Sequence, residues 1–227
     1  GHVAVLKMNP VNDYLIEFLD AALKPLIDRG FVRIVRGGTD VGQYLCNHPL
    51  VETLHITGAG ASHDAIVWGT GEKGAANKAA NTPINTRQIT SELGAVCPTI
   101  VVPGPWSAAD IRFQAEQVAC QVLVLPKDWD QKSAFVQALE NVIGNALPRG
   151  LYYPGAPERL AEFCTNNPTF KTVKRPGAQD LVMSTLDLGN AKARTTEVFA
   201  PALNVVEIGG QKAEAYLIAA IALANSQ

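Results

Sequence analysis

Short β-branched segments alternate with longer amphipathic segments along the chain, and this alternation constrains the fold more than any other feature. In the first third, strand-like and helix-like segments follow one another at residues 2–7, 12–28, 31–35, 39–47, 53–57 and 61–68. Strands separated by helices of this length favour parallel βαβ units over hairpins. The sequence therefore predicts an α/β fold that opens with a Rossmann-like parallel sheet.

The alternation stops and then resumes. Residues 69–88 are small and polar with little periodicity, so we expect a surface excursion there. The pattern restarts near residues 93–98, which predicts two domains, 1–93 and 94–227, the second also α/β. In the second domain, strands are expected at 98–104, 121–126, 180–188 and 202–208, and helices at 107–119, 129–145, within 152–164 and at 215–227.

Composition limits the partners of the chain. Its 227 residues suffice for one large or two small domains with a sizeable core. The 19 basic and 21 acidic residues leave a net charge of -2, which provides no basic field for nucleic acid or an anionic membrane. We therefore expect no nucleic-acid partner and no membrane partner.

The cysteines and the two ends of the chain indicate the cellular compartment and the extent of the protein. No two cysteines have CxxC spacing, and cysteines are too sparse for a disulfide scaffold. We therefore expect reduced thiols in a cytoplasmic protein. No signal peptide is visible, and the most apolar stretch, 215–224, is too short to span a bilayer and is predicted to be a buried helix. Because the chain opens in strand-like and stops in helix-like sequence, we expect a piece of a longer protein.

Two local features could carry chemistry. Glu92 directly precedes the apolar run "LGAVCPTIVVPG", and a buried carboxylate is costly unless it is paired or used, so Glu92 is either a structural oddity or a base. The stretch "TGAGASH", residues 57–63, follows a strand and opens a helix, the setting in which backbone N–H groups bind phosphate. It departs from GxGxxG because His63 replaces the last glycine, and a tight turn explains it equally well.

The order of five short motifs makes the pattern specific. A "VLK" strand end is followed by a glycine pair, "HPLVETLHITG", "SELG" before an apolar strand, and much later "TEVFAPAL". This order resembles the aldehyde dehydrogenase superfamily, which shows a "VVLKP"-like strand, an "HP…I-x-F-T-G-S" turn, "E-L-G-G-K-x-P" and "E-E-I-F-G-P-V". The resemblance extends over essentially the whole chain.

The resemblance implies a coenzyme, NAD or NADP, and the residues that hold it. Residues 1–93 would be the C-terminal part of a coenzyme-binding domain and 94–227 an incomplete catalytic domain. In the family, a carboxylate three residues after the lysine often selects NAD over NADP. Pro10 occupies that position here, so the sequence does not exclude NADP as the coenzyme. The implied coenzyme-binding residues are Lys7 at the adenine ribose, Gly38, Thr57 and Gly58 at close backbone approaches, Ala59 and Ser62 at the pyrophosphate, the Leu93 carbonyl at the nicotinamide, Glu197 at its ribose, and Phe199 beside it.

The resemblance also implies a reaction. A cysteine thiolate would attack an aldehyde, and hydride loss to the nicotinamide would leave a thioester. Glu92 would then be the general base for the water that releases a carboxylic acid. Partial burial of Glu92 would raise its pKa toward the range suited to a base. The implied partner is a small aldehyde, the full-length protein would be a homo-oligomer, and no metal is expected.

The nucleophile is where the sequence departs from the family. Only 28 residues separate Glu92 from Cys120, which is shorter than usual, and no "F-N-x-G-Q-x-C"-like loop is present. Either a loop that carries the nucleophile is absent between Gln117 and Val118, or Cys120 has taken this role. The remaining cysteines, Cys46, Cys97 and Cys164, are expected to be small buried hydrophobic residues.

Other readings remain open. A CoA-acylating aldehyde dehydrogenase would transfer the acyl group to CoA, so that Glu92 would be needed less. A coenzyme-binding module without catalysis would explain both the absent nucleophile loop and the irregular "TGAGASH" turn. A purely structural protein would leave the ordered set Lys7, Thr57, Glu92 and Glu197 as a coincidence. The family's oxyanion asparagine would precede Gly1.

Overall fold

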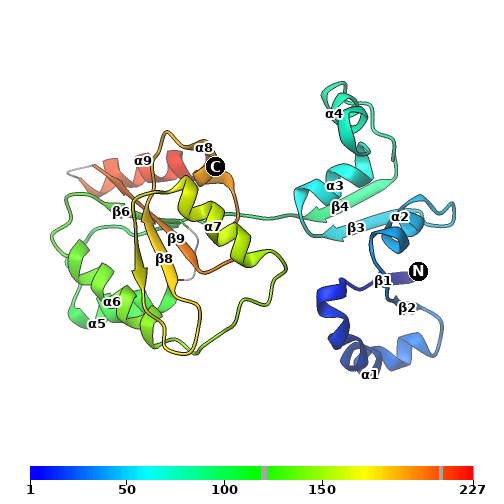
Figure 1. The fold of residues 1–227 in the computed structure, drawn as a ribbon, viewed down its shortest axis with the longest axis horizontal. Helices are drawn as coiled ribbons and strands as arrows, with labels where there is room; N and C mark the ends of the chain where they lie inside the picture. Colours follow the sequence, from blue (N-terminus) through cyan, green and yellow to red (C-terminus); the bar gives the residue numbers. More distant parts are fainter. Residues whose placement is uncertain (119–121, 210–211, 227) are drawn as a thin grey trace. The chain divides into compact units, whose positions relative to one another are not determined.

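The chain divides into two compact units in a computed structural model, residues 1–94 and 95–227 (Figure 1). The structure describes residues 1–118, 122–209 and 212–226. Both units are built from strands and helices in alternation, so the α/β fold class predicted from the sequence is confirmed.

The first unit contains two separate pairs of parallel strands. One pair joins β1 to β2 and the other joins β3 to β4, each with at least one helix in the connection. The alternating pattern predicts the first pair, whereas it predicts no strand at β4. The elements are β1 (Ala4–Lys7), the 3-10 helix η1 (Pro10–Leu15), α1 (Ile16–Ile27), β2 (Val32–Val35), α2 (Thr39–Asn47), β3 (Thr53–Thr57), α3 (Gly60–Val67), α4 (Gly71–Ala79) and β4 (Gln88–Glu92).

The surface excursion expected at 69–88 is wrong in part, because this stretch holds α4 and the first residue of β4. Helix α4 is polar and has no apolar stripe, which is why periodicity did not reveal it. Tertiary contacts hold it instead. Asn77 donates to the Trp68 carbonyl at 2.9 Å, and Lys78 pairs with Asp64 of α3 at 2.6 Å.

The second unit is built on a five-stranded sheet in the order β5-β6-β9-β8-β7. All neighbouring strands are parallel except β7, which runs antiparallel to β8 at one edge. The elements are β5 (Thr99–Ile100), α5 (Ala108–Gln117), β6 (Val122–Pro126), α6 (Lys132–Asn145), α7 (Ala156–Asn166), β7 (Phe170–Val173), β8 (Leu181–Thr185), α8 (Ala191–Thr195), β9 (Ala202–Ile208) and α9 (Ala213–Ala224).

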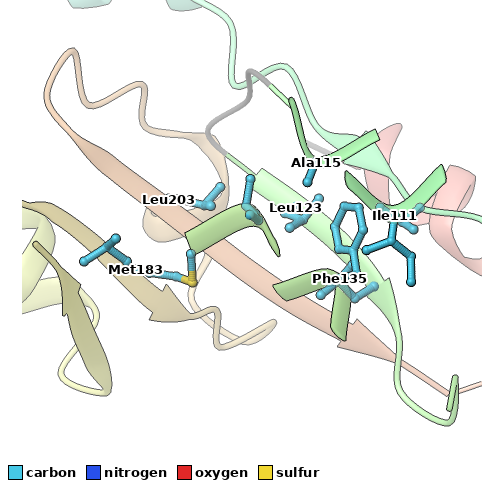
Figure 2. Close-up of a cluster of buried hydrophobic side chains, with 10 residues drawn as sticks. Ile111, Ala115, Leu123, Phe135, Met183 and Leu203 are labelled. Carbon is cyan, nitrogen blue, oxygen red and sulfur yellow. The ribbon is translucent and has the colours of Figure 1, made fainter. Parts of the chain in front are cut away.

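Side-chain alternation along β6 explains the layers of this unit. Every residue of β6 is buried, and successive side chains of a strand point to opposite faces. Leu123 and Leu125 join a cluster that includes Phe135 of α6 (Figure 2). Val122 and Val124 join a second cluster with helix α9. The sheet is thus covered on one face by α5 and α6 and on the other by α9 and α7 (Figure 1).

Helix α9 is where the sequence predicts a buried helix, and it is buried only along one side. Tyr216 and Ala220 are fully buried, and the Tyr216 hydroxyl donates to the Val124 carbonyl at 3.0 Å. Ile218 is 64% exposed and Ile221 45% exposed. The helix is therefore confirmed, but its full burial is wrong, because only one face reaches the sheet. Among the described residues, no helix is long and apolar enough to cross a membrane.

Candidate functional site

Thr57 and Glu92, two of the predicted site residues, end neighbouring parallel strands. The register of β3 and β4 pairs Thr57 with Glu92, and the Thr57 hydroxyl donates to Glu92 Oε2 at 3.2 Å. The Gly58 N–H donates to the Glu92 carbonyl at 3.0 Å. Ligands of open α/β sheets bind at the carboxyl ends of parallel strands. The structure therefore brings the predicted turn and the predicted base to one such edge.

Glu92 is exposed rather than partly buried, so the burial predicted from the sequence is wrong. The physical reason is that Glu92 is the last residue of β4, a strand that belongs to a two-stranded sheet and in which only Ile89 is partly buried. Leu93 follows it and is also exposed. The position of Glu92 at the end of β4, rather than burial, is therefore what fits a role as a base.

The turn after β3 leads directly into helix α3. Ala59 is the N-cap residue and has an extended backbone conformation, and Ser62 lies in the first turn of the helix. No side chain caps this end of α3, so the N–H groups of Gly60 and Ala61 are available to an anion. The Ser62 N–H already donates to the Ala59 carbonyl at 2.9 Å. A Cβ added at Gly58 would meet only ordinary contacts, the nearest at 3.7 Å from Ile56 Cγ1. Gly58 therefore leaves open space, but the fold does not require glycine there.

Lys7 and the glycine pair occupy the corresponding edge of the β1–β2 pair. Lys7 ends β1, and its Nζ donates to the Met8 carbonyl at 3.2 Å. Gly38 is the N-cap residue of α2, again without a side-chain cap. Gly37, which the sequence did not single out as a site residue, has φ +142°, and a Cβ there would lie 2.3 Å from Val41 Cγ2. Glycine is thus required at 37 rather than at 38.

Glu197 and Phe199 lie in the second unit, in the loop between α8 and β9. Glu197 Oε2 accepts a hydrogen bond from the Ala95 N–H at 3.0 Å. Phe199 has a left-handed backbone, with φ +51°, which is uncommon for a residue other than glycine. The two predicted residues therefore share one loop, and its conformation is held by residues that the sequence analysis did not select.

Tyr153 and Arg159 are those residues. The Tyr153 ring stacks on the Phe199 ring, with centroids 5.0 Å apart. The Arg159 guanidinium lies 5.8 Å from the centre of the Tyr153 ring and 5.9 Å from that of Phe199, and its Nε donates to the Val198 carbonyl at 2.8 Å. The paired tyrosines before "PGAPER" were the available signal in the sequence. The contact of Tyr153 with Phe199 joins residues 46 positions apart, so no local pattern predicts it.

A small cavity lies beside this loop. Its volume is about 50 Å³, and Arg159, Asn166, Lys192 and Glu197 are among the residues that line it. Glu162, which also lines it, pairs with Lys192, and this ion pair holds the pKa of the Glu162 carboxyl below its ordinary value. A cavity of this size has room for a few water molecules.

The described cysteines differ in how far they are buried. Cys120, one of the two alternatives for the nucleophile, lies outside the described residues. Cys46 and Cys164 are partly buried, and burial raises the pKa of the Cys46 thiol while the nearby Arg87 opposes this. Cys97 is exposed and has φ +46°, so its expected burial is wrong. In the described part of the chain, no cluster of His, Cys, Asp and Glu side chains could hold a metal ion.

Comparison with known proteins identifies the fold. No family model and no curated protein matches the sequence. Solved structures do match. They include a gamma-glutamyl-gamma-aminobutyraldehyde dehydrogenase from Burkholderia cenocepacia, with 21% identity and a TM-score of 0.73, which aligns over 99% of this chain and 48% of its own. A lactaldehyde dehydrogenase aligns over 99% of this chain and 50% of its own, with 19% identity and a TM-score of 0.70.

A third match is a variant of aldehyde dehydrogenase C from Pseudomonas syringae, solved with NAD+ and octanal. It has 17% identity and a TM-score of 0.68, over 99% of this chain and 49% of its own. The chain therefore has the fold of aldehyde dehydrogenases, as the motif resemblance predicts. It spans about half the length of the solved enzymes that it matches.

Proposed function

We propose that this chain is part of an NAD(P)-dependent aldehyde dehydrogenase that oxidises an aldehyde to a carboxylic acid through a cysteine thioester. The observation that carries the proposal is the pairing of Thr57 with Glu92 at the carboxyl ends of two parallel strands, beside the uncapped start of α3. These residues belong to motifs whose order resembles the family, and the fold is that of solved members.

The residues at the strand ends fit a dinucleotide. Uncapped N–H groups at the starts of α2 and α3 suit a pyrophosphate, because a helix N-terminus favours anions. Lys7 ends β1 and its ammonium would bond the adenine ribose, while Gly38 is the N-cap residue of α2 and has no side chain there. Under this proposal, residues 1–93 hold the coenzyme and residues 94–227 contribute Glu197 and Phe199 to the nicotinamide end.

The chain's own residues would then have distinct roles. Glu92 would remove a proton from water, and the resulting hydroxide would attack the thioester carbon and release the acid. The Thr57 hydroxyl holds Glu92 Oε2, which fixes the orientation of the carboxylate. Glu197 and the stacked Phe199 would orient the nicotinamide ribose, while Arg159 and Tyr153 hold their loop. The coenzyme, when bound, supplies the acceptor for the hydride that leaves the covalent adduct.

The exposure of Glu92 favours a second candidate, a CoA-acylating aldehyde dehydrogenase. In that enzyme a thiol, rather than water, receives the acyl group, and a base of raised pKa is needed less. The two candidates share the thioester and the coenzyme and differ only in the final acceptor. A module that binds coenzyme without catalysis remains a third outcome of the same experiment. For each candidate we propose a cytoplasmic protein that forms homo-oligomers.

The experiment uses the intact protein that carries this chain. Octanal serves as the probe aldehyde with NAD+ or NADP+, with and without CoA, and mass spectrometry identifies the product. We expect octanoic acid without CoA, with at least a hundredfold loss of steady-state acid production in Glu92→Gln. The exposed carboxylate variant Glu52→Gln is the matched control and should retain wild-type activity.

Each alternative has its own signature in this experiment. Octanoyl-CoA as the product identifies the CoA-acylating enzyme. Saturable binding of coenzyme, without turnover and without an aldehyde-protected, iodoacetamide-reactive cysteine, identifies the module. Failure to bind either coenzyme contradicts the proposed function altogether.

A further inference from the structure

A continuous line of polar side chains runs along one face of the β3–β4 pair. Alternate residues of a strand share a face, so His55 and Thr57 lie on the same side of β3. The parallel register places Thr90 beside His55 and Glu92 beside Thr57. Hydrogen bonds connect them in sequence, at 2.8 Å from Thr90 Oγ1 to His55 Nδ1, at 3.3 Å from His55 Nε2 to Thr57 Oγ1, and at 3.2 Å from Thr57 Oγ1 to Glu92 Oε2. We call these four residues the polar line.

The directions of these bonds follow from the number of hydrogens available. The Thr57 hydroxyl has one hydrogen, and the carboxylate of Glu92 can only accept, so this hydrogen points to Glu92 Oε2. His55 Nε2 must then carry a hydrogen and donate it to Thr57 Oγ1. That leaves Nδ1 of neutral His55 to accept from the Thr90 hydroxyl. All three bonds of the polar line are thus directed toward Glu92.

Both ends of the polar line are exposed to solvent, and they differ in the side chain that each presents. Among the described residues, none donates a hydrogen bond to Glu92 Oε1, so this oxygen is open to a reacting water. At the other end His55 is exposed, so its ring can exchange protons with solvent. Histidine is the side chain whose ordinary pKa lies nearest to neutrality. The polar line therefore joins a carboxylate at the predicted site to a group able to hold a proton.

We propose that His55 is a proton-transfer residue for Glu92, acting through the Thr57 hydroxyl. The inference rests on the proposed function, since it takes Glu92 as the base in thioester hydrolysis. An O–H bond of water breaks, its oxygen bonds to the acyl carbon, the cysteine sulfur leaves, and the proton goes to Glu92. The proton then passes from Glu92 to Thr57 Oγ1 as the Thr57 hydrogen passes to His55 Nε2, and His55 releases a proton to solvent.

Acceptance at Nε2 requires the second tautomer of His55. In that form Nδ1 carries the hydrogen and donates it to Thr90 Oγ1, while the Nε2 lone pair faces the Thr57 hydroxyl. Thr90 can serve both tautomers, because a hydroxyl both donates and accepts. The exposed ring changes tautomer by proton exchange with water. No oxidant, reductant or metal ion takes part in these steps.

If His55 only stabilised the sheet, position 55 would need a hydrogen-bonding side chain but not one that transfers protons. Cross-strand polar pairs stabilise a sheet without transferring protons, and a glutamine at 55 can donate to Thr57 as His55 does. Glutamine cannot hold and release a proton at neutral pH. His55→Gln therefore separates hydrogen bonding from proton transfer, and Thr57→Val, which replaces the hydroxyl by a methyl group, interrupts the polar line beside Glu92.

The kinetic test follows a single turnover of the intact protein with octanal and NAD+. The burst of reduced coenzyme reports thioester formation, and the later release of octanoic acid reports hydrolysis. We expect the burst to be unchanged in His55→Gln and His55→Ala, and acid release to fall about tenfold or more in both. Added imidazole should restore acid release in His55→Ala. Acid release at the wild-type rate in His55→Gln would overturn the proposal.

A second measurement does not depend on activity. Nitrogen NMR of ring-labelled histidine reports which nitrogen of His55 carries the hydrogen. We expect the Nε2–H tautomer in the wild type and a shift toward the Nδ1–H tautomer in Thr57→Val, with Glu52→Gln as an unaffected control. The same tautomer in Thr57→Val and the wild type would overturn the polar line itself. If the wild type shows no burst, the proposed function fails and the transfer step fails with it, while the tautomer result still decides whether the polar line exists.

Discussion

The two units of the chain differ sharply in how much apolar surface they bury. The second unit packs helices on both faces of a five-stranded sheet, and Phe135, Leu123 and Tyr216 are fully inaccessible. The first unit has only two-stranded sheets, and strand pairs of this size are marginally stable by themselves. Several of its large apolar side chains, among them Phe18 and Phe31, are more than half exposed. Glu92 therefore belongs to the unit with the smaller hydrophobic core, and Glu197 to the unit with the larger one.

The strongest test of this contrast is a pair of phenylalanine truncations. Phe135 is 0% exposed and contacts the rings of Trp106 and Trp129, whereas Phe18 is 62% exposed. Phe135→Ala should lower the free energy of unfolding by about 3–5 kcal/mol. Phe18→Ala should change it by less than about 0.5 kcal/mol. Denaturant titration of the 227-residue chain measures both, and equal losses would contradict the contrast.

A smaller effect is expected from Tyr216, whose buried hydroxyl bonds to the Val124 carbonyl. Tyr216→Phe should lower the free energy of unfolding by about 1 kcal/mol at neutral pH. Burial raises the pKa of Tyr216 above its ordinary value, so the unfolded chain loses this proton first as pH rises. The free energy of unfolding of the wild type should therefore fall above about pH 10.

The variant provides the control for the alkaline effect. Because Tyr216→Phe has no proton to lose at this position, its free energy of unfolding should fall less steeply than that of the wild type above the same pH. Parallel slopes in denaturant titrations at neutral and alkaline pH would show that Tyr216 does not stay protonated in the folded unit.

The smallest predicted effect concerns helix caps. Ser107 forms a capping box with Asp110 at the start of α5, whereas Thr70 makes no side-chain cap at the start of α4. Ser107→Ala should lower the free energy of unfolding by about 1 kcal/mol, and Thr70→Ala should leave it almost unchanged. Denaturant titration measures both free energies of unfolding. A loss in Ser107→Ala alone would support the contrast between the two units.

The same cap predicts an acid effect. Hydrogen bonds from Ser107 hold the pKa of the Asp110 carboxyl below its ordinary value. The stabilisation from this carboxylate is present above the unfolded pKa, about 4, and is lost as pH falls through the lower folded pKa. Ser107→Ala should flatten this acid dependence, and an unchanged acid dependence in the variant would contradict the assignment.

Hydrophobic periodicity predicted the elements that bury an apolar face and missed those that do not. The strands β3, β6 and β9 lie where β-branched runs predict them. Hydrophobic periodicity does not reveal α4 and α8, because α4 is polar and α8 has only five residues. The pattern also missed two strands that are mostly exposed, β4 and the four-residue edge strand β7. Tertiary contacts, rather than local pattern, decide such elements.

The candidate site was predicted as a set of residues but not as a geometry. Motif order selected Thr57 and Glu92, yet their hydrogen bond depends on the register of β3 and β4, which no local pattern contains. The stacking of Tyr153 on Phe199 likewise joins distant segments. The predicted burial of Glu92 was wrong because an apolar neighbour in sequence need not be a neighbour in space.

The central claim is that a cysteine of the intact protein forms a thioester that Glu92 helps to hydrolyse. The most direct measurement is the mass of the intact Glu92→Gln variant after incubation with octanal and NAD+. The account predicts a persistent covalent octanoyl adduct on one cysteine, located by peptide mapping, and its rapid loss in the wild type. The absence of an adduct from both proteins, or equally rapid loss from both, would contradict the account.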